Sequence, residues 1–274
     1  MPLSVLLTPL PSACDVAVVI DVLRFTTGAA YALANGARSI VPCATLDDAQ
    51  AHAGQALLAG ERNAVRPEGF DLGNSPLEFT RAAVQGRDIA WTTTNGTRAL
   101  AILMARQAAP ERAGAGGGTA APGNPLLVPP PVPRPFASTP SSFRPNSCDL
   151  LLASYVNLTA IVSRLERRLR EDAVVAIACS GREGGFALED SACAGALVHR
   201  LRAALGDRLT MNDDARASAC IDEAYGEDFA RLFRDAQHGR FLRDHGFGAD
   251  LDACGALDAV QVVPRWHDGR FVAG

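Results

Sequence analysis

Short apolar runs alternate along the chain with longer stretches rich in alanine. The apolar runs predict strands at Val16–Asp21, Arg38–Pro42, Ala56–Gly60, Asp88–Thr93, Asp149–Ala153, Ala173–Cys179 and Ala259–Val263. Most of these runs are continuously apolar, which is typical of strands buried on both faces of a sheet. Because helical patterns lie between the strands, we predict an α/β sandwich with a largely parallel sheet and helices on both faces.

The helical stretches have start and stop signals of their own. Thr45 and Asp48 form a capping-box pattern, and Gly36 ends the helix that we expect over Thr27–Asn35. Further helices are expected over Gly96–Gln107, Asn157–Glu171 and Glu189–Leu205, and the acidic region Asp213–His245 is mostly helical in pattern. No internal repeat is visible, so residues 1–274 are interpreted as a single α/β domain.

One stretch interrupts this alternation. Residues 107–148 contain ten prolines and five glycines in 42 positions. Proline lacks the N–H that a helix or a central strand needs, so we expect a disordered or polyproline insert here. Its glycine run, Gly114–Gly118, follows no predicted strand and opens no predicted helix, so we do not interpret it as a dinucleotide-binding loop.

Polar side chains follow five of the predicted strands. In sheets of this kind, ligands bind beyond the carboxyl ends of the strands, so these residues are candidates for one common site. They are Asp21 and Arg24; Glu61 and Arg62, followed by Asp71, Asn74 and Ser75; Thr92–Arg98; Ser154 and Asn157; and Cys179–Glu183.

The Thr92–Arg98 segment has the features of an anion-binding helix start. Its hydroxyls and glycine lead directly into a helix, where N–H groups and the helix dipole favour a negative charge. Arg98 adds a guanidinium that is suited to a phosphate oxygen. The alternative is that Thr94 and Asn95 only cap the helix.

The other candidates also have structural explanations. These are a buried ion pair for Asp21 and Arg24, a turn for Asp71 and Asn74, a helix-dipole role for Glu189 and Asp190, and packing or surface exposure for His238.

The amino-acid composition excludes several kinds of catalytic site and argues against some partners. All 26 basic residues are arginine, which excludes a Schiff-base lysine, a P-loop lysine and a lysine general base. The net charge of −4 argues against a nucleic-acid partner. The seven cysteines contain no C-x-x-C pair, so we expect reduced thiols and no structural zinc. No apolar run reaches membrane length and no signal peptide is recognisable, so we expect a cytoplasmic protein without membrane contact.

Familiar hydrolase signatures are also absent. Leu23 stands where a D-x-D motif starting at Asp21 needs a second aspartate, and Gly185 stands where a loop starting at Cys179 needs an arginine. There is no G-x-S-x-G elbow. An anion-binding site with several carboxylates remains, and this set suits Mg²⁺, which takes one or two carboxylates together with water and substrate oxygens.

Several long segments resemble the 2-phosphosulfolactate phosphatase family of coenzyme M biosynthesis. They are Val19–Thr27, Ala34–Ala37, Gly60–Arg62, Gly69–Thr80, Thr92–Leu100, Cys179–Asp190, Cys193–Gly195, Gln237–Arg240 and Asp250–Pro264. The resemblance implies a Mg²⁺-dependent phosphomonoesterase that converts 2-phospho-3-sulfolactate and water to 3-sulfolactate and phosphate. It also implies a three-layer α/β/α fold with a mixed sheet.

The implied substrate carries a phosphate, a sulfonate and a carboxylate, which arginine forks can meet. The arginines at candidate positions are Arg24, Arg62, Arg98, Arg182 and Arg240. The candidate catalytic residues are Asp21, Arg24, Glu61, Asp71, Arg98 and His238, with His238 as a proton donor to the leaving group. The candidate substrate-binding residues are Asn74, Ser75, Thr93, Thr94, Asn95, Gly96, Thr97, Asn157, Gly181, Arg182 and Arg240. The candidate metal ligands are Asp21, Glu61, Asp71, Glu189 and Asp190.

Two other functions stay open. One is a non-catalytic, anion-binding or regulatory relative of such an enzyme, and the other is a phosphatase for a different small phosphorylated hydroxy acid. In each case the expected partner is a small anionic molecule, and the sequence is compatible with a homo-oligomer.

Overall fold

The computed structural model describes residues 1–6, 14–97, 99–100 and 148–274. Two sequence-based predictions lie outside these residues: the role of Arg98, and the 107–147 part of the proline-rich insert. Within the described residues, no helix is both long enough and apolar enough to cross a bilayer.

The described residues build one mixed sheet of ten strands in the order β4-β5-β3-β10-β9-β6-β2-β7-β1-β8. The strands are β1 (Pro2–Leu6), β2 (Val16–Ile20), β3 (Ser39–Pro42), β4 (Leu57–Gly60), β5 (Asp88–Thr92), β6 (Asp149–Ala153), β7 (Val175–Cys179), β8 (Thr210–Met211), β9 (Pro264–His267) and β10 (Arg270–Ala273).

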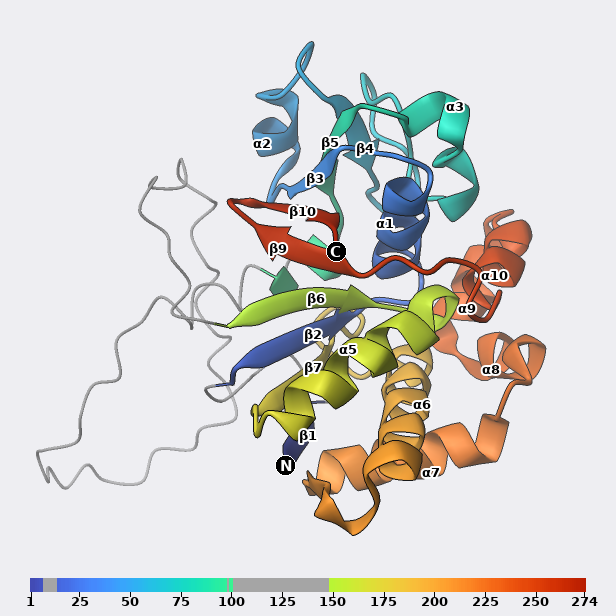
Figure 1. Cartoon of the computed structure of the whole chain (residues 1–274). Helices are drawn as coiled ribbons and strands as arrows, with labels where there is room; N and C mark the ends of the chain where they lie inside the picture. Colours follow the sequence, from blue (N-terminus) through green and yellow to red (C-terminus); the bar gives the residue numbers. More distant parts are fainter. Residues whose placement is uncertain (7–13, 98, 101–147) are drawn as a thin grey trace, which may run out of the picture.

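Two parallel groups of strands make up this sheet. The first is β4, β5 and β3, and the second is β6, β2, β7, β1 and β8. The antiparallel hairpin β9–β10 joins them, as the red arrows between β3 and β6 show in Figure 1. Because three antiparallel pairings separate β3 from β6, the strands of the two groups run in opposite senses.

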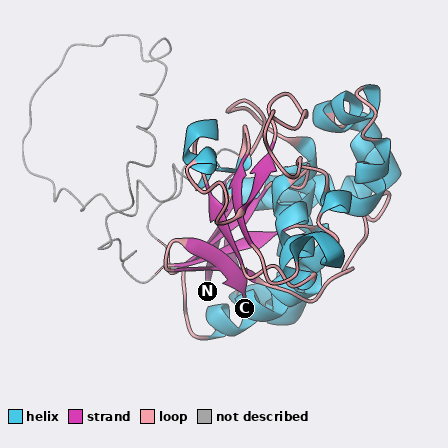
Figure 2. Cartoon of the chain, turned by 90° about the horizontal axis from the view of Figure 1, so that it is seen from above, coloured by secondary structure: helices cyan, strands magenta, loops and turns pink. Residues whose placement is uncertain are grey.

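Helices flank this sheet (Figure 2). They are α1 (Phe25–Ala34), α2 (Leu46–Gln50), α3 (Arg81–Val84), α5 (Leu158–Arg170), α6 (Leu188–Leu205), α7 (Asp213–Tyr225), α8 (Phe229–Asp235), α9 (Gln237–Asp244) and α10 (Gly248–Cys254). Three short 3₁₀ turns are η1 (Pro76–Glu78), η2 (Tyr155–Asn157) and η3 (Gly206–Arg208). A further helical segment starts at Gly96.

Strand β2 shows how the core divides into two layers. Val16, Val18 and Ile20 join a cluster with α5 and α6, whereas Ala17 and Val19 join a cluster with α1. Both faces of the strand are therefore buried, as the continuously apolar run predicts. The predicted α/β sandwich and its mixed sheet are confirmed.

A close approach between α6 and α7 depends on a glycine. A Cβ atom built on Gly195 would lie 2.0 Å from the carbonyl oxygen of Ser218. No side chain larger than hydrogen fits there unless the two helices separate.

Several predicted elements differ from the structure. The expected strand Ala259–Val263 is wrong, because these residues are irregular and the strand starts at Pro264. Strands β1, β8 and β10 were not predicted; β8 has only two residues, too few to show a hydrophobic period. The predicted capping box at Thr45 is confirmed, since Thr45 Oγ1 accepts from the backbone N–H of Asp48 at 3.0 Å. The helical prediction for Asp213–His245 is confirmed as α7, α8 and α9.

Candidate active site

Loops that follow β2, β4, β5 and β7 line one cleft together with the start of α9. The lining residues are Asp21, Leu23, Arg24, Glu61, Asn63, Ala64, Asn74, Thr93, Thr94, Asn95, Arg182, Glu183, His238 and Phe241. Four of the five predicted strand ends therefore contribute to one cleft, whereas Ser154 and Asn157, after the Asp149–Ala153 strand, do not line it. The strand groups that supply these loops run in opposite senses, and residues from both groups line the cleft.

Asp21 lies at the end of β2 and is 6% exposed. Burial raises the pKa of its carboxyl to about 6, against the lowering effect of nearby His238. A Cβ atom built on Gly96 would lie 2.6 Å from Asp21 Oδ2, so the helix start after β5 passes directly against this carboxylate. Only glycine permits this approach.

Glu61 connects the loops after β4 and β5. Its Oε1 accepts from the backbone N–H of Thr94 at 2.8 Å, and its Oε2 accepts from that of Ala64 at 2.9 Å. The N–H of Thr94 therefore points to a carboxylate of the chain itself. This corrects the expectation that this N–H is available to an anion.

The helix start is capped by a different pair than expected. Thr93 Oγ1 accepts from the N–H of Thr97 at 3.1 Å, and Thr97 Oγ1 accepts from the N–H of Thr93 at 3.2 Å. The side chain of Asn95 instead accepts from the N–H of Glu183 at 3.0 Å and so links the loops after β5 and β7. Thr93 and Thr97 thus hold the loop, and Thr93, Thr94 and Asn95 line the cleft.

Arg182 lines the cleft and has the weaker ion pair of the two cleft arginines. Its Nη1 is buried and has no hydrogen-bond partner among the described residues. Its guanidinium carbon lies 4.8 Å from the centre of the Phe241 ring, and its Nε lies 3.7 Å from Glu183 Oε1, whose side chain is 77% exposed. A buried guanidinium donor without an acceptor is costly unless a ligand supplies one. This position is suited to an anion.

Arg24 differs from Arg182 because it has a full ion-pair partner. Its Nη1 donates to Asp250 Oδ2 at 2.6 Å, and both side chains are buried. The alternative that Arg24 pairs with Asp21 is therefore wrong, although Arg24 does form a buried ion pair. Ser75, expected to bind substrate, instead donates from Oγ to Asp250 Oδ1 at 2.6 Å.

His238, at the start of α9, lines the cleft with a side chain that is 17% exposed. Its Nδ1 lies 3.6 Å from Oε1 of Glu189, which is almost fully buried at the start of α6. This distance allows an electrostatic pairing that orients the imidazole ring. Glu189 is therefore placed to act on His238.

Four candidates serve the fold in this structure rather than the cleft. Asp71 Oδ2 accepts from the N–H of Leu58 in β4 at 2.8 Å. Asn157 donates from Nδ2 to the carbonyl oxygens of Leu152 and Val262. Arg240 is exposed and donates to the carbonyl oxygen of Asp235 at 2.5 Å. For these three residues the predicted roles are corrected, because the required atoms point to the backbone.

Asp190 is the fourth. Its Oδ1 accepts from the N–H of Val22 and its Oδ2 from that of Gly181, at 2.9 Å and 3.1 Å. Asp190 is thus a brace between the loops after β2 and β7, and Gly181 takes part through its backbone. Burial and the neighbouring charge of Glu189 raise the pKa of Asp190 well above its usual range.

Of the five predicted metal ligands, Asp21 and Glu61 line the cleft, whereas Asp71, Glu189 and Asp190 do not. Among the described residues, no three His, Cys, Asp or Glu side chains are arranged to hold a metal ion. Asp21 and Glu61 line the same cleft, and Mg²⁺ is often bound through one or two carboxylates together with substrate phosphate oxygens. This pair therefore fits Mg²⁺, whereas Asp71 and Asp190 do not.

Some site residues escaped the sequence analysis. Asn63 lies one position beyond the predicted strand-end motif Glu61–Arg62, so a wider window around that strand end would have included it. Phe241 lies one helical turn after His238, and this spacing is a usable signal. Asp250 begins one of the segments that resemble the family, Asp250–Pro264, but it does not follow a predicted strand end and was therefore not among the candidates.

Comparison with known proteins identifies the family of this chain. The sequence profile of the 2-phosphosulpholactate phosphatase family matches residues 5–109 and 142–269. The unmatched positions 110–141 fall within the proline-rich stretch.

Individual relatives match along nearly the whole chain. A probable 2-phosphosulfolactate phosphatase of Pseudothermotoga lettingae is 34% identical over 98% of this chain and 98% of its own length. A protein of Thermotoga petrophila with the same description is 32% identical over 96% of this chain and 93% of its own length. A third, from a Synechococcus strain, is 36% identical over 92% of this chain and 88% of its own length. With a matching profile and relatives of this coverage, the chain belongs to the 2-phosphosulpholactate phosphatase family.

Proposed function

We propose that this chain hydrolyses the phosphate ester of 2-phospho-3-sulfolactate and releases 3-sulfolactate and inorganic phosphate. Relatives described as probable 2-phosphosulfolactate phosphatases support this substrate. The observation that carries the proposal in this chain is the unpaired, buried Nη1 of Arg182 in a cleft that also contains Asp21 and Glu61. An oxyanion of the substrate supplies the acceptor that Arg182 lacks.

Among the described residues, few cations are in place to bind the three anionic groups of the proposed substrate. Arg24 and Arg182 line the cleft. Arg62 donates to the carbonyl oxygen of Glu61 at 2.6 Å and to Thr92 Oγ1 at 3.1 Å, so it braces the loop after β4. In the part of the chain that the structure describes, two cleft guanidiniums stand beside several carboxylates. A metal ion would add positive charge for a trianionic substrate.

Asp21 and Glu61 are the residues that would hold Mg²⁺. The ion supplies positive charge next to the phosphoryl oxygens when it is bound. Each oxygen of Glu61 accepts one N–H, from Thr94 and from Ala64, and keeps a second lone pair that could bind the ion.

The remaining chemistry is proton movement around a substitution at phosphorus. A new P–O bond forms to the attacking oxygen, and the P–O bond to the sulfolactate oxygen breaks. Asp21 accepts a proton from the attacking water as a carboxylate, and a pKa of about 6 keeps it largely ionised near neutral pH. His238 donates a proton to the leaving oxygen, with Glu189 orienting the ring.

A second route uses Asp21 as the nucleophile and passes through an aspartyl phosphate. Rapid quenching with ³²P-labelled substrate distinguishes the two routes. Label that remains on the protein and is lost in Asp21→Asn supports the covalent route. Absence of label during steady turnover supports direct attack by water.

The proposal is tested by phosphate release from a panel of 2-phosphosulfolactate, phospholactate and phosphoglycerates, with Mg²⁺ and with EDTA. We expect 2-phosphosulfolactate to have the highest kcat/KM and EDTA to abolish turnover. A higher kcat/KM for another phospho-acid would identify a different substrate. Tight binding without release under either condition would show a non-catalytic anion-binding protein.

A further inference from the structure

The guanidinium of Arg24 is held on three sides. Besides the bond from Nη1 to Asp250, its Nη2 donates to the carbonyl oxygen of Ala64 at 3.2 Å. Its guanidinium carbon lies 4.4 Å from the centre of the Phe247 ring. With only 2% of the residue exposed, these contacts restrict a long side chain to one arrangement at the cleft wall.

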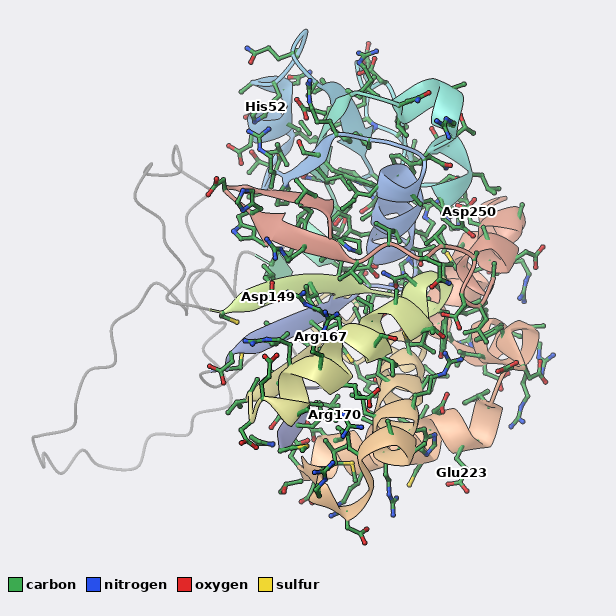
Figure 3. The ribbon with its side chains drawn as sticks, in the orientation of Figure 1. His52, Asp149, Arg167, Arg170, Glu223 and Asp250 are labelled. Carbon is green, nitrogen blue, oxygen red and sulfur yellow. The ribbon has the colours of Figure 1, made fainter. Side chains whose placement is uncertain are left out.

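Both carboxylate oxygens of Asp250 accept hydrogen bonds from side chains of the protein. It lies in the first turn of α10 (Figure 3) and is 3% exposed. Its Oδ2 accepts from Arg24, and its Oδ1 accepts from Ser75 Oγ, both at 2.6 Å. Asp250 is not among the residues that line the cleft. Any effect of Asp250 on the substrate therefore passes through Arg24.

The Arg24–Asp250 pair carries no net charge. A buried ion pair is weak evidence for stability, because desolvation offsets much of the attraction. Orientation is a better explanation for this pair, because the guanidinium offers five N–H donors in a rigid fork and needs a defined angle to meet an oxyanion.

We propose that Asp250 is a positioning residue, which holds the Arg24 guanidinium in the orientation that binds a substrate oxyanion, with Ser75 in turn holding Asp250. This inference rests on the proposed phosphatase function. It connects three distant segments: the loop after β2, the turn before η1 and helix α10.

Two substitutions test the proposal in the full-length chain. Asp250→Asn keeps the shape and one acceptor but removes the charge, and Ser75→Ala removes only the hydroxyl that holds Asp250. We expect kcat/KM to fall at least about tenfold in Asp250→Asn and about threefold in Ser75→Ala, with a change in KM in both. KM does not depend on the fraction of folded protein, so a purely structural role would leave it unchanged.

A double-mutant cycle with Arg24→Met gives the second readout. If Asp250 acts through Arg24, Asp250→Asn adds less than about a twofold change in kcat/KM in the Arg24→Met background. Equal effects in both backgrounds, or an unchanged KM in Asp250→Asn, would overturn the proposal. If Arg24→Met does not fold, the KM of Ser75→Ala decides.

The matched control is Asp222→Asn. Asp222 also pairs with a side chain that contains nitrogen, since its Oδ2 lies 2.7 Å from His199 Nδ1, but neither residue lines the cleft. We expect wild-type KM and kcat in this variant.

Failure of the proposed function is recognised separately. If the wild-type chain releases no phosphate from any substrate, calorimetry with inorganic phosphate replaces the kinetic assay. Weaker phosphate binding in Asp250→Asn than in wild type then supports the positioning role, and equal affinity refutes it.

Discussion

Replacing Arg182 with methionine tests the central feature of the cleft. Methionine keeps an unbranched apolar chain against Phe241 and removes the guanidinium. Because Nη1 of Arg182 has no acceptor within the described residues, the bond that it makes with substrate is absent from the free protein. We therefore expect the loss to appear in kinetics and not in folding stability.

The magnitude follows from the kind of bond. A hydrogen bond to a charged group contributes about 1.5–3 kcal/mol, and about 1.4 kcal/mol corresponds to a tenfold change in rate. The Arg182→Met variant should therefore lose roughly 10- to 150-fold in kcat/KM for phosphate release. Its melting temperature should equal or exceed that of wild type, because a buried unsatisfied donor has been removed.

Arg231→Met is the matched control. Arg231 also lies over an aromatic ring, with its guanidinium carbon 4.9 Å from the centre of Tyr225, but it is exposed on α8 and does not line the cleft. Its kcat/KM should match wild type. A wild-type kcat/KM for Arg182→Met, or a lower melting temperature with unchanged kinetics, would refute the assignment of Arg182 to substrate binding.

Three further predictions concern the fold. Gly195→Ala should lower the free energy of unfolding by at least about 1–3 kcal/mol in urea, because its Cβ would overlap the carbonyl oxygen of Ser218; wild-type stability would show that α6 and α7 can separate freely. The bond from Arg38 lowers the pKa of Asp88, so this carboxylate stabilises the fold above its unfolded pKa of about 3.9 and loses that effect as pH falls through the lower folded value. The stability difference between wild type and Asp88→Asn should therefore shrink between about pH 5 and pH 2, and a constant difference would contradict this. Deleting residues 110–141, which the family profile does not match, should leave kcat/KM within about threefold of wild type; loss of folding would show that this stretch is required.

The sequence was informative wherever chemistry lies close to a strand end. Asp21 and Glu61 follow strands directly, Arg182 lies three positions after one, and all three line the cleft. Continuous apolar runs identify such strands because a strand buried on both faces has no polar positions. The same rule placed Asn157 in the site wrongly, since its amide bonds to carbonyl oxygens that the sequence cannot locate.

Partners were harder to predict than positions. Arg24 was correctly expected at the site, but its counterion, Asp250, lies 226 positions away in the sequence. Likewise, the N–H of Thr94 is engaged by Glu61 from another loop. Such pairings depend on the relative placement of distant segments, and local periodicity carries no information about that placement.

The position of the β9–β10 hairpin also bears on how the protein matures during synthesis. The strand β10 pairs with β3 through Phe271 and Ile40, so a contact across most of the chain joins the two halves of the sheet. Because β9 and β10 leave the ribosome after all the other described strands, the two groups of strands can each begin to form but cannot be paired into one sheet before then. The cleft takes loops from both halves, so a nascent chain that has not yet released residues 264–273 has no complete active site.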